Sequence, residues 1–356
     1  MAQAIENSEL AAKTLIVGLG ATGLSCARFL ASQGVQVAVA DSRDEPPGLQ
    51  ALHAEYPDIA VFLGPFDDAL FDSAERLVVS PGVPVSTPQI DAARRRGIPV
   101  MGDIELFVHA AQAPVVAITG SNGKSTVTIL LAEMAKACGV VVAVGGNLGT
   151  PALDLLDDAI ELYVLELSSF QLETTDSVQA AVATVLNVSP DHMDRYPDLS
   201  TYAAAKARVF QGAGVGVYNA DDPVVAAMGG ADDAWYFTLG ESHEEKMFGL
   251  CRNDGEAYLC RGEQPLLAAA ELKIPGLHNR ANALAALAMG TALGFEQAAM
   301  AAVLRSYRGL PHRTEFVAEI NGVRWYNDSK GTNVGASLAA LEGLHEDDET
   351  RIVLIA

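Results

Sequence analysis

Residues 119–126, Thr-Gly-Ser-Asn-Gly-Lys-Ser-Thr, have the composition of a phosphate-binding loop. They follow an apolar run, 115–118, and precede an expected helix, 127–137, whose N-terminus adds partial positive charge. The glycines let backbone N–H groups close around anionic oxygens. Lys124 can reach terminal phosphates and Ser125 can ligate Mg²⁺, so the segment predicts a nucleoside triphosphate site. The predicted contacts are Gly120, Ser121, Asn122, Gly123, Lys124, Ser125 and Thr126.

The spacing within this loop is shorter than usual. The standard pattern places its first glycine where this chain has Ile118, and the first glycine here is Gly120. A short loop points to a particular subgroup of nucleotide-binding proteins. The alternative is a glycine-rich turn between a strand and a helix, with its lysine exposed to solvent.

A second glycine pattern, Gly18-x-Gly20-x-x-Gly23, lies between the first expected strand and the first expected helix. Asp41 follows at the end of the next strand, where it can bind a ribose hydroxyl. The pattern fits an NAD(P) enzyme, and it fits a nucleotide-diphosphate sugar equally well. The third possibility is a tight turn needed only for helix packing.

Polar residues follow two further strands. Glu166 ends an apolar strand, where it can hold Mg²⁺ beside the phosphate loop or serve as an ordinary strand-end acid. His192 lies in the segment Asp-His-Met-Asp-Arg, and it can ligate a metal or bind a substrate phosphate. Alternatively, Asp191 and Asp194 in this segment cap a helix.

Other polar residues are ambiguous from their chemistry alone. Lys206 lies on an expected helix, where a lysine usually extends into solvent. Asn279 and Asn282 share one helix face and can bind an adenine base or cap the helix. Arg313 can contact phosphate from a hinge, and the polar loop 328–333 can bind an anion or cap the helix that follows.

The elements that position these residues alternate between strand and helix, which predicts a parallel, doubly wound α/β sheet. In the first unit we expect strands at 14–17, 35–40 and 76–79, and helices at 22–32 and 88–96. A second unit is expected to start near Ile104 with the phosphate-loop strand. Its other elements are strands at 140–144, 162–165, 181–186 and 215–218, a strand-and-turn stretch at 235–260 and a helix at 279–293.

A linker at 309–313 leads to a third unit. It is expected to hold a hairpin, 316–320 with 323–326, whose Asn-Gly turn is of type I′. A helix at 334–344 and an apolar strand at 351–355 follow. Such a strand is normally followed by a further loop and helix, so this unit is expected to be incomplete.

Composition narrows the class of protein. A length of 356 residues suggests two or three domains, and a net charge of −22 argues against a general nucleic-acid surface. The four cysteines show no metal-like spacing and no disulfide framework, which favours a reducing cytoplasm. No signal peptide and no apolar stretch of about 18 residues is visible, so no membrane association is expected.

Taken in order, these motifs resemble the Mur ligase family of peptidoglycan synthesis, and the resemblance covers nearly the whole chain. The strings Ser-Ser-Phe-Gln (168–171) and Asp-His-Met-Asp-Arg (191–195) favour its D-glutamate-adding branch. The other motifs that carry the resemblance lie at 18–23, 119–126, 165–172, 277–282, 310–313 and 328–333.

The resemblance implies a three-domain α/β architecture. Residues 1–103 would form a Rossmann-like domain for a uridine-diphosphate sugar, which argues against NAD(P). Residues 104–309 would form the ATP-binding domain, and residues 310–356 would begin a Rossmann-like domain that helps to hold D-glutamate. The implied nucleotide-sugar contacts are Thr22, Asp41, Ser42, Ser80, Gly82, Asn147, His192, Lys330 and Thr332.

The resemblance also implies roles at the reacting end. Ser125 and Glu166 match a first Mg²⁺ site. Lys206 matches a lysine that is carbamylated in the family, which turns a cation into an anion that holds a second Mg²⁺, with His192 beside it. Lys124, His192 and Lys206 would thus be catalytic. The implied nucleotide contacts outside the loop are Asn279, Asn282, Arg313 and Asp328.

The implied activity is that of an ATP-dependent, ADP-forming amide ligase. It would add D-glutamate to UDP-N-acetylmuramoyl-L-alanine through an acyl phosphate, as a monomer in the cytoplasm. Two alternatives remain open. One is a sister ligase of the same chemistry, such as an alanine-adding enzyme or a folylpolyglutamate synthetase. The other is a nucleotide-sugar-binding protein without catalytic activity.

Overall fold

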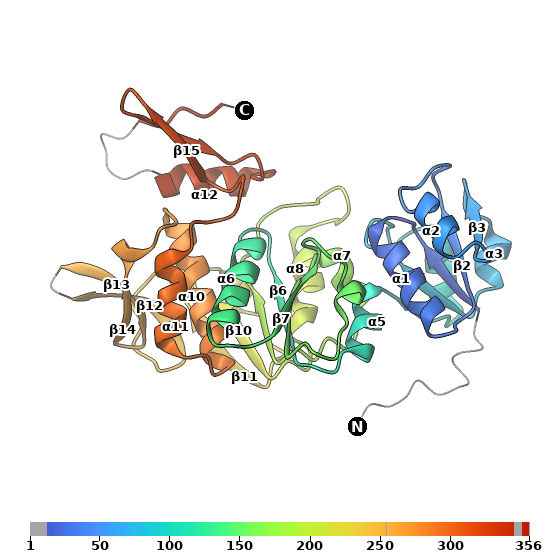
Figure 1. The fold of residues 1–356 in the computed structure, drawn as a ribbon, viewed down its shortest axis with the longest axis horizontal. Coiled ribbons are helices and arrows are strands. Elements are labelled where there is room, and N and C mark those ends of the chain that lie inside the picture. Colours follow the sequence, from blue (N-terminus) through green and yellow to red (C-terminus); the bar gives the residue numbers. More distant parts are fainter. Residues whose placement is uncertain (1–12, 254, 345–350, 356) are drawn as a thin grey trace.

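The computed structural model describes residues 13–253, 255–344 and 351–355. They form three consecutive units, with the N-terminal unit at one end of the central one (Figure 1). The C-terminal segment packs at the other end, where its helix α12 (Val334–Leu344) contacts α10 (Leu277–Ala292). The three-layer α/β arrangement of the first two units confirms the predicted fold class.

The N-terminal unit is built on a parallel five-stranded sheet of order β3-β2-β1-β4-β5. Strand β1 is fully buried, as its apolar residues require, and the glycine-rich turn after it leads into helix α1. This order places the ends of β1, β2 and β4 side by side, which is where such sheets bind ligands. The elements are β1 (Thr14–Val17), α1 (Ala21–Ser32), β2 (Val37–Asp41), α2 (Leu49–Glu55), β3 (Ala60–Leu63), α3 (Asp68–Asp72), β4 (Arg76–Val79), α4 (Pro88–Arg95) and β5 (Val100–Met101).

The central unit contains a nine-stranded sheet of order β14-β13-β12-β11-β10-β9-β6-β8-β7, parallel from β7 to β12 and antiparallel beyond it. The phosphate-loop strand β6 lies between β8 and β9, so polar residues after these strands converge at one edge. The strands are β6 (Val115–Thr119), β7 (Val142–Gly146), β8 (Leu162–Glu166), β9 (Val182–Val185), β10 (Val215–Asn219), β11 (Asp233–Phe237), β12 (Met247–Asn253), β13 (Glu256–Arg261) and β14 (Gln264–Ala268).

Helices cover this sheet, and α5 precedes it as the connection from the N-terminal unit. The second unit therefore opens with a helix, whereas the sequence had predicted the phosphate-loop strand. Helix α6 also begins earlier than predicted, at Lys124, because its first turn is part of the phosphate loop. The helices are α5 (Asp103–Ala110), α6 (Lys124–Ala137), η2 (Ala152–Leu155), α7 (Ser169–Leu172), α8 (Leu199–Ala207), η3 (Arg208–Phe210), α9 (Pro223–Ala226), η4 (Ala269–Glu271), α10 and α11 (Gln297–Ser306).

The C-terminal segment has a hairpin of β15 (Glu315–Ile320) and β16 (Val323–Asn327), followed by α12. Its turn residues Asn321 and Gly322 have φ of 53° and 78°, as the predicted type I′ turn requires. The strand expected at 351–355 is wrong, since these residues have no regular secondary structure. Within the described residues no strand pairs with them, and an isolated strand is not stable in water.

The N-terminal and central units share one hydrophobic core. A single cluster runs from Ile16 of β1 through Phe107 of α5 to Tyr163 of β8. The rings of Phe107 and Tyr163 meet edge to face with centroids 5.0 Å apart. A second cluster on the other face of the central sheet packs α6 and α10 against the strands. The first two units are therefore fixed together by packing, mainly through α5.

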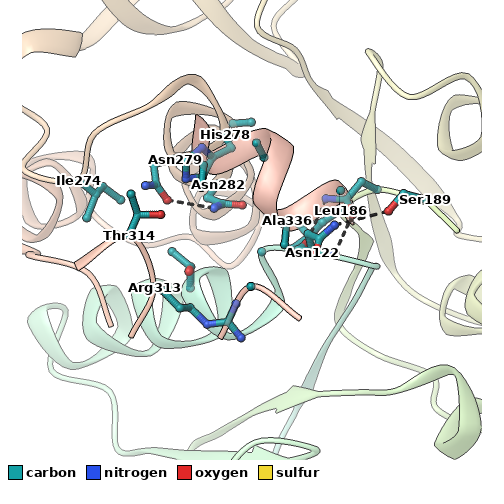
Figure 2. A pocket seen from close by; sticks show the side chains of 18 of the residues that line it. Asn122, Leu186, Ser189, Ile274, His278, Asn279, Asn282, Arg313, Thr314 and Ala336 are labelled. Atoms are coloured by element: carbon teal, nitrogen blue, oxygen red, sulfur yellow. Dashed lines mark hydrogen bonds between the residues drawn. The ribbon is translucent and has the colours of Figure 1, made fainter. Parts of the chain in front are cut away.

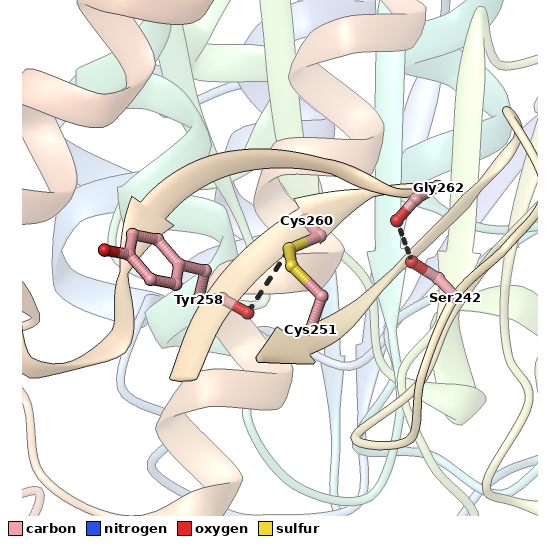
Figure 3. The surroundings of a disulfide bond; sticks show 5 residues. All are labelled: Ser242, Cys251, Tyr258, Cys260 and Gly262. Atoms are coloured by element: carbon pink, nitrogen blue, oxygen red, sulfur yellow. Dashed lines mark hydrogen bonds between the residues drawn. A yellow bond between two sulfur atoms is a disulfide. The ribbon is translucent and has the colours of Figure 1, made fainter. Parts of the chain in front are cut away.

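A disulfide joins Cys251 of β12 to Cys260 of β13, with the Cα atoms 6.0 Å apart (Figure 3). This corrects the expectation that the chain has no disulfide. In the hairpin register Cys251 is opposite Tyr258, so Cys260 lies diagonally across on the same face. This adjacency arises from the register of two strands, which the spacing of cysteines in the sequence does not reveal. The other two cysteines, Cys26 and Cys138, are free.

Across the part of the chain that the structure describes, no helix has both the length and the apolar character needed to cross a membrane.

Candidate functional site

The phosphate loop joins β6 to α6 in a tight, close-packed turn. Gly120 and Gly123 have φ of 150° and 83°, a region that side chains other than glycine rarely adopt. A Cβ at Gly123 would also collide with the amide oxygen of Asn282 on α10. The side chain of Asn187, after strand β9, fixes the loop, because the Asn122 N–H donates to Asn187 Oδ1 at 2.8 Å and Asn187 Nδ2 donates to Asn122 O at 3.0 Å.

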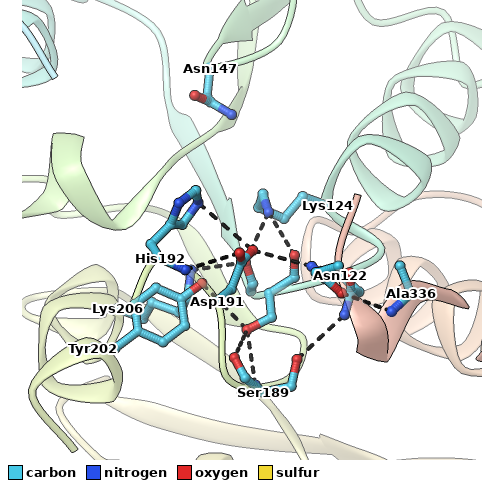
Figure 4. Close-up of polar contacts among 12 residues, drawn as sticks. Asn122, Lys124, Asn147, Ser189, Asp191, His192, Tyr202, Lys206 and Ala336 are labelled. Carbon is cyan, nitrogen blue, oxygen red and sulfur yellow. Dashed lines mark hydrogen bonds and ion pairs between the residues drawn. The ribbon is translucent and has the colours of Figure 1, made fainter. Parts of the chain in front are cut away.

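Lys124 folds back over this loop. Its Nζ donates to the carbonyl oxygens of Gly120 and Ser121, both at 3.0 Å (Figure 4). Burial lowers the pKa of the ammonium, and the nearby Glu166 and Asp191 partly offset this effect. The cation therefore rests on neutral carbonyl groups, which an anionic phosphate can replace as its partner.

Ser125 and Glu166 form a short polar chain beside the loop. Ser125 Oγ donates to Glu166 Oε2 at 2.7 Å, and Asn147 Nδ2 donates to Glu166 Oε1 at 2.8 Å. Arg313 Nη2 from the C-terminal segment donates to Ser125 Oγ at 3.1 Å. The structure thus brings together four predicted site residues from four separate parts of the chain.

The helix position of Lys206 alone suggested that its side chain extends into solvent, but the structure shows that the side chain is buried. Only 1% of the residue is exposed, and its Nζ donates to Gly120 O at 2.9 Å and lies 4.4 Å from the ring centre of Tyr202. Burial, and next the positive charge of Lys124, lower the pKa of Lys206 well below its ordinary value.

His192 lies in the loop 189–196 with a left-handed φ of 55°. Its ring packs on Phe170 with centroids 4.9 Å apart, and its Nε2 is 3.7 Å from Asp191 Oδ2. About half of the side chain, 47%, is exposed. Figure 4 shows His192 and Lys206 on the same side of the phosphate loop. Asp191 also accepts from Asn333 Nδ2 at 3.2 Å, which ties this loop to the C-terminal segment.

A cavity of about 340 Å³ adjoins the phosphate loop (Figure 2). Asn279 and Asn282 of α10 line it, and they are linked by a hydrogen bond of 3.3 Å. Arg313 and Asp328 reach it from the C-terminal segment, and the Asp328 carboxylate accepts from Thr314 N at 2.7 Å. Four predicted nucleotide contacts from outside the loop therefore surround one cavity.

Three predicted substrate contacts, His192, Lys330 and Thr332, are not brought to a cavity. Lys330 and Thr332 are exposed and line neither this cavity nor the second one described below. Their neighbour Gly331 does line the first cavity.

The second cavity, of about 560 Å³, lies between the N-terminal and central units. Its N-terminal wall comes from the ends of β1, β2 and β4, and its central wall includes Gly146, Asn147 and Gln171. Ser80 Oγ donates to Gly18 O at 2.8 Å and fixes the glycine-rich turn. The predicted residues that line this cavity are Thr22, Asp41, Ser42, Ser80, Gly82 and Asn147.

Asp41 is not a free acceptor, in contrast to the role expected from the glycine pattern. Its Oδ2 accepts from Leu19 N and Arg43 Nη2, both at 2.7 Å, and its Oδ1 accepts from Arg43 N at 2.9 Å and Nε at 2.8 Å. Burial raises the pKa of Asp41, but these hydrogen bonds outweigh it and lower the pKa to about 2. Two bonds on each oxygen use the usual acceptor capacity of a carboxylate.

Two residues of this cavity were missed from the sequence, Arg43 and Gln171. The guanidinium of Arg43 is clamped by Asp41 while 52% of its side chain stays exposed, so it can meet a ligand. Gln171 is the third residue of α7 and forms a capping box with Ser168. The spacing Ser-x-x-Gln in the sequence indicates this capping box. No neighbouring residue in the sequence indicates that Gln171 lies at a cavity.

The oxygens of Ser125 and Glu166 are the hard donors that Mg²⁺ prefers. Their hydrogen bond shows that both can approach one point, so these two residues fit a magnesium ion. Among the described residues no group of three His, Cys, Asp or Glu side chains gathers around one point. Further ligands would have to come from the nucleotide, water or a modified side chain.

The fold and the loop define an α/β protein of the phosphate-loop class. The chain belongs to the Mur ligase family. Residues 12–102 match the family described as Mur ligase MurD-like, N-terminal domain, and residues 118–290 match the Mur ligase middle domain. These two matches cover most of the chain. They include all the residues that line the second cavity and the residues from Asn122 to Asn282 that line the first.

Curated relatives agree with this assignment. A UDP-N-acetylmuramoylalanine–D-glutamate ligase of Nitrosococcus oceani is 57% identical over 350 residues, covering 98% of this chain and 77% of the relative. One of Pseudomonas fluorescens is 55% identical over 343 residues, covering 96% of this chain and 76% of the relative. UDP-N-acetylmuramate-alanine ligase MurC of Thermotoga maritima has a similar fold, with a TM-score of 0.56 at 21% identity, over 94% of this chain and 78% of that one.

Proposed function

We propose that this chain is an ATP-dependent, ADP-forming ligase that joins D-glutamate to UDP-N-acetylmuramoyl-L-alanine in peptidoglycan precursor synthesis. The chain's high identity to ligases of that name supports the choice of substrates. One structural observation carries the proposal further. The hydrogen-bonded chain from Asn147 through Glu166 to Ser125 connects the wall of the cavity between the units to the phosphate loop.

This connection suggests how the two substrates meet. The nucleotide sugar would occupy the cavity between the units, with its L-alanyl carboxylate directed past Asn147. ATP would occupy the cavity at the phosphate loop, with its base near Asn279 and Asn282. The carboxylate then attacks the γ-phosphorus of ATP, ADP leaves, and an acyl phosphate forms.

Lys124 would leave its two carbonyl partners and stabilise the negative charge on the transferred phosphoryl group. The amine of D-glutamate then attacks the acyl carbon, and the amide forms as phosphate leaves. Asn333 and Arg313 connect the C-terminal segment to this site, so closure of that segment would keep water from the acyl phosphate. Lys330 and Thr332 remain proposed substrate contacts that this closure would have to bring in.

Magnesium, held by Ser125 and Glu166, would supply charge neutralisation at the phosphates. We further propose a second metal site at Lys206 and His192. In it the neutral amine of Lys206 adds to carbon dioxide, forms a carbamate and releases a proton. The burial of Lys206 and the neighbouring Lys124 favour the neutral amine, and the positive charge of Lys124 also favours the resulting anion.

Several broader features belong to the same proposal. We propose domain boundaries after residues 103 and 309, where α5 begins and where the hinge before Arg313 lies. We also propose that the protein acts as a monomer in the cytoplasm, where ATP and nucleotide sugars are available.

Product analysis tests this function. Protein supplied with ATP, Mg²⁺ and UDP-N-acetylmuramoyl-L-alanine is expected to release ADP and form an amide only when D-glutamate is added. A panel of other amino acids and of folate substrates separates the sister ligases. Release of ADP when L-alanine replaces D-glutamate, or when a folate replaces the nucleotide sugar, would contradict the proposal. Binding of the nucleotide sugar without any turnover would also contradict it.

A further inference from the structure

The connection between the first two units contains a buried acid that the proposed mechanism does not use. Asp103 is the first residue of α5, and only 2% of it is exposed. Its Oδ2 accepts from Gln171 Nε2 at 2.9 Å, across 68 residues of sequence. Its Oδ1 is buried and has no hydrogen-bond partner among the described residues. A buried carboxylate with an unmatched oxygen destabilises the fold.

The contact with Asp103 determines which way the Gln171 amide points. An ionised carboxylate can only accept, so the amide nitrogen must face Asp103. The amide oxygen then faces Ser168, where it accepts from the backbone N–H at 3.1 Å and from Oγ at 3.2 Å. Within the described chain the amide nitrogen has no other acceptor, so one N–H is left for a ligand.

Gln171 lines the cavity between the units, on the same wall as Asn147 and Gly146. That wall belongs to the central unit, whereas the glycine-rich turn and Arg43 line the opposite wall. A ligand that places its nucleotide at the glycine-rich turn therefore presents its far end to Gln171. In the proposed substrate that end carries the sugar and acyl oxygens, which accept hydrogen bonds.

We propose that Asp103 is a positioning residue for the nucleotide-sugar substrate: it fixes the amide of Gln171 so that its free N–H meets an acceptor oxygen of the sugar-acyl end. This inference rests on the proposed function. It assigns a binding role to the first turn of α5, the helix that joins the two units (Figure 1).

A neighbouring acid provides a matched control. Glu105, on the same helix, is also buried, and it accepts from Asp176 N at 2.7 Å and from Ser177 N at 3.1 Å. These contacts fasten α5 to the chain just after α7, whereas the Asp103 contact fastens it to α7 itself, and Glu105 lines neither cavity. A purely structural role would make Asp103→Asn and Glu105→Gln behave alike.

The test is a double-mutant cycle read by calorimetric binding of UDP-N-acetylmuramoyl-L-alanine to the full chain without ATP. Asp103→Asn, which lets the Gln171 amide rotate, is expected to raise the Kd about 10-fold, as loss of one well-placed hydrogen bond would. Glu105→Gln is expected to leave the Kd unchanged. In a Gln171→Ala background Asp103→Asn should have no further effect on the Kd.

Steady-state kinetics provide a second reading. The KM for the nucleotide sugar should rise in Asp103→Asn, while the KM for ATP stays that of the wild type. If Asp103→Asn does not fold, Gln171→Asn tests the same contact, since its shorter side chain withdraws from Asp103 and should also raise the Kd.

An unchanged Kd in Asp103→Asn, or additive effects in the cycle, would overturn the inference while leaving the proposed function intact. Wild-type protein that fails to bind the nucleotide sugar would instead overturn both.

Discussion

The two cavities hold their charged groups in different ways. At the phosphate loop, Lys124 rests on two backbone carbonyls that an anion can replace. Between the units, Asp41 has both oxygens doubly hydrogen-bonded, and Gln171 is held at both ends of its amide. The first site is arranged to change partners when a ligand arrives. The second is built before the ligand arrives and is rigidly supported.

This difference predicts separate kinetic signatures. Residues of the phosphate loop act on a group whose charge develops during the reaction, so their loss should lower kcat. Residues of the cavity between the units act on ground-state binding, so their loss should raise the KM of the nucleotide sugar. The following variants test the contrast.

The largest effect is expected for Lys124→Ala. Removal of the ammonium that is proposed to stabilise the transferred phosphoryl group should lower kcat by at least about 10³-fold. Binding of the nucleotide sugar should stay unchanged, as measured by calorimetry. Turnover near that of the wild type would refute the role of this loop.

A smaller loss, about 10²-fold, is expected for Lys206→Ala, because it would remove a ligand of the proposed second metal site. Small carboxylic acids should restore part of the activity by replacing the lost anion, and they should not rescue Lys124→Ala. The ADP release rate, measured with and without added acetate, checks this. If Lys206→Ala turns over as the wild type does, the carbamate proposal is wrong.

Asp41→Asn should act only on binding. The amide cannot accept from the guanidinium and the Leu19 N–H together as the carboxylate does, so Arg43 loses its fixed position. We expect the KM of the nucleotide sugar to rise about 10-fold with little change in kcat. A drop in kcat at saturating nucleotide sugar would contradict the claim that residues of this cavity act only on binding.

A further prediction concerns the stability of the fold, at Asp103, and not the kinetics of the reaction. Burial raises the pKa of its carboxyl from 3.8 to about 6, although the hydrogen bond from Gln171 works against this. Between these two values the folded protein binds more protons than the unfolded chain, so this group's contribution falls as pH rises and is lowest above pH 6. The loss amounts to about 3 kcal/mol at neutral pH.

Asp103→Asn should therefore be relatively more stable at pH 7.5 than at pH 4.5, compared with the wild type, even though it binds the nucleotide sugar less well. Urea denaturation at the two pH values measures this difference. The buried thiol of Cys26 on α1 interacts with Asp103 and with Asp154 of η2, and both Cys26 and Asp154 are unchanged in this variant. Parallel stability curves would contradict the assigned burial effect.

The sequence predicted the parts of the molecule that are encoded by neighbouring residues. Strand β6, the phosphate loop and Glu166 at the end of β8 follow from local patterns of apolar residues, glycines and polar strand ends. The doubly wound sheets follow from the same alternation. The type I′ turn at Asn321 follows from two residues alone.

The remainder depends on contacts between distant residues. The pairing of Gln171 with Asp103 and the burial of Lys206 under the loop exist only once the sheets have formed. The hydrogen bonds from Arg43 to Asp41 could not be predicted from the sequence. An acid that binds a ribose and an acid that pairs with an arginine occupy the same position at the end of a strand. The disulfide arises from hairpin register, and residues 351–355 show that an apolar run alone does not make a strand.

Isotope transfer tests the central claim most directly. UDP-N-acetylmuramoyl-L-alanine carrying ¹⁸O in its L-alanyl carboxylate is incubated with the protein, ATP, Mg²⁺ and D-glutamate, and the released phosphate is analysed by mass spectrometry. If that carboxylate attacks the γ-phosphorus held at Lys124, each phosphate released with amide product will contain one labelled oxygen. Amide product formed together with phosphate that is free of label, or no amide product at all, would contradict the account.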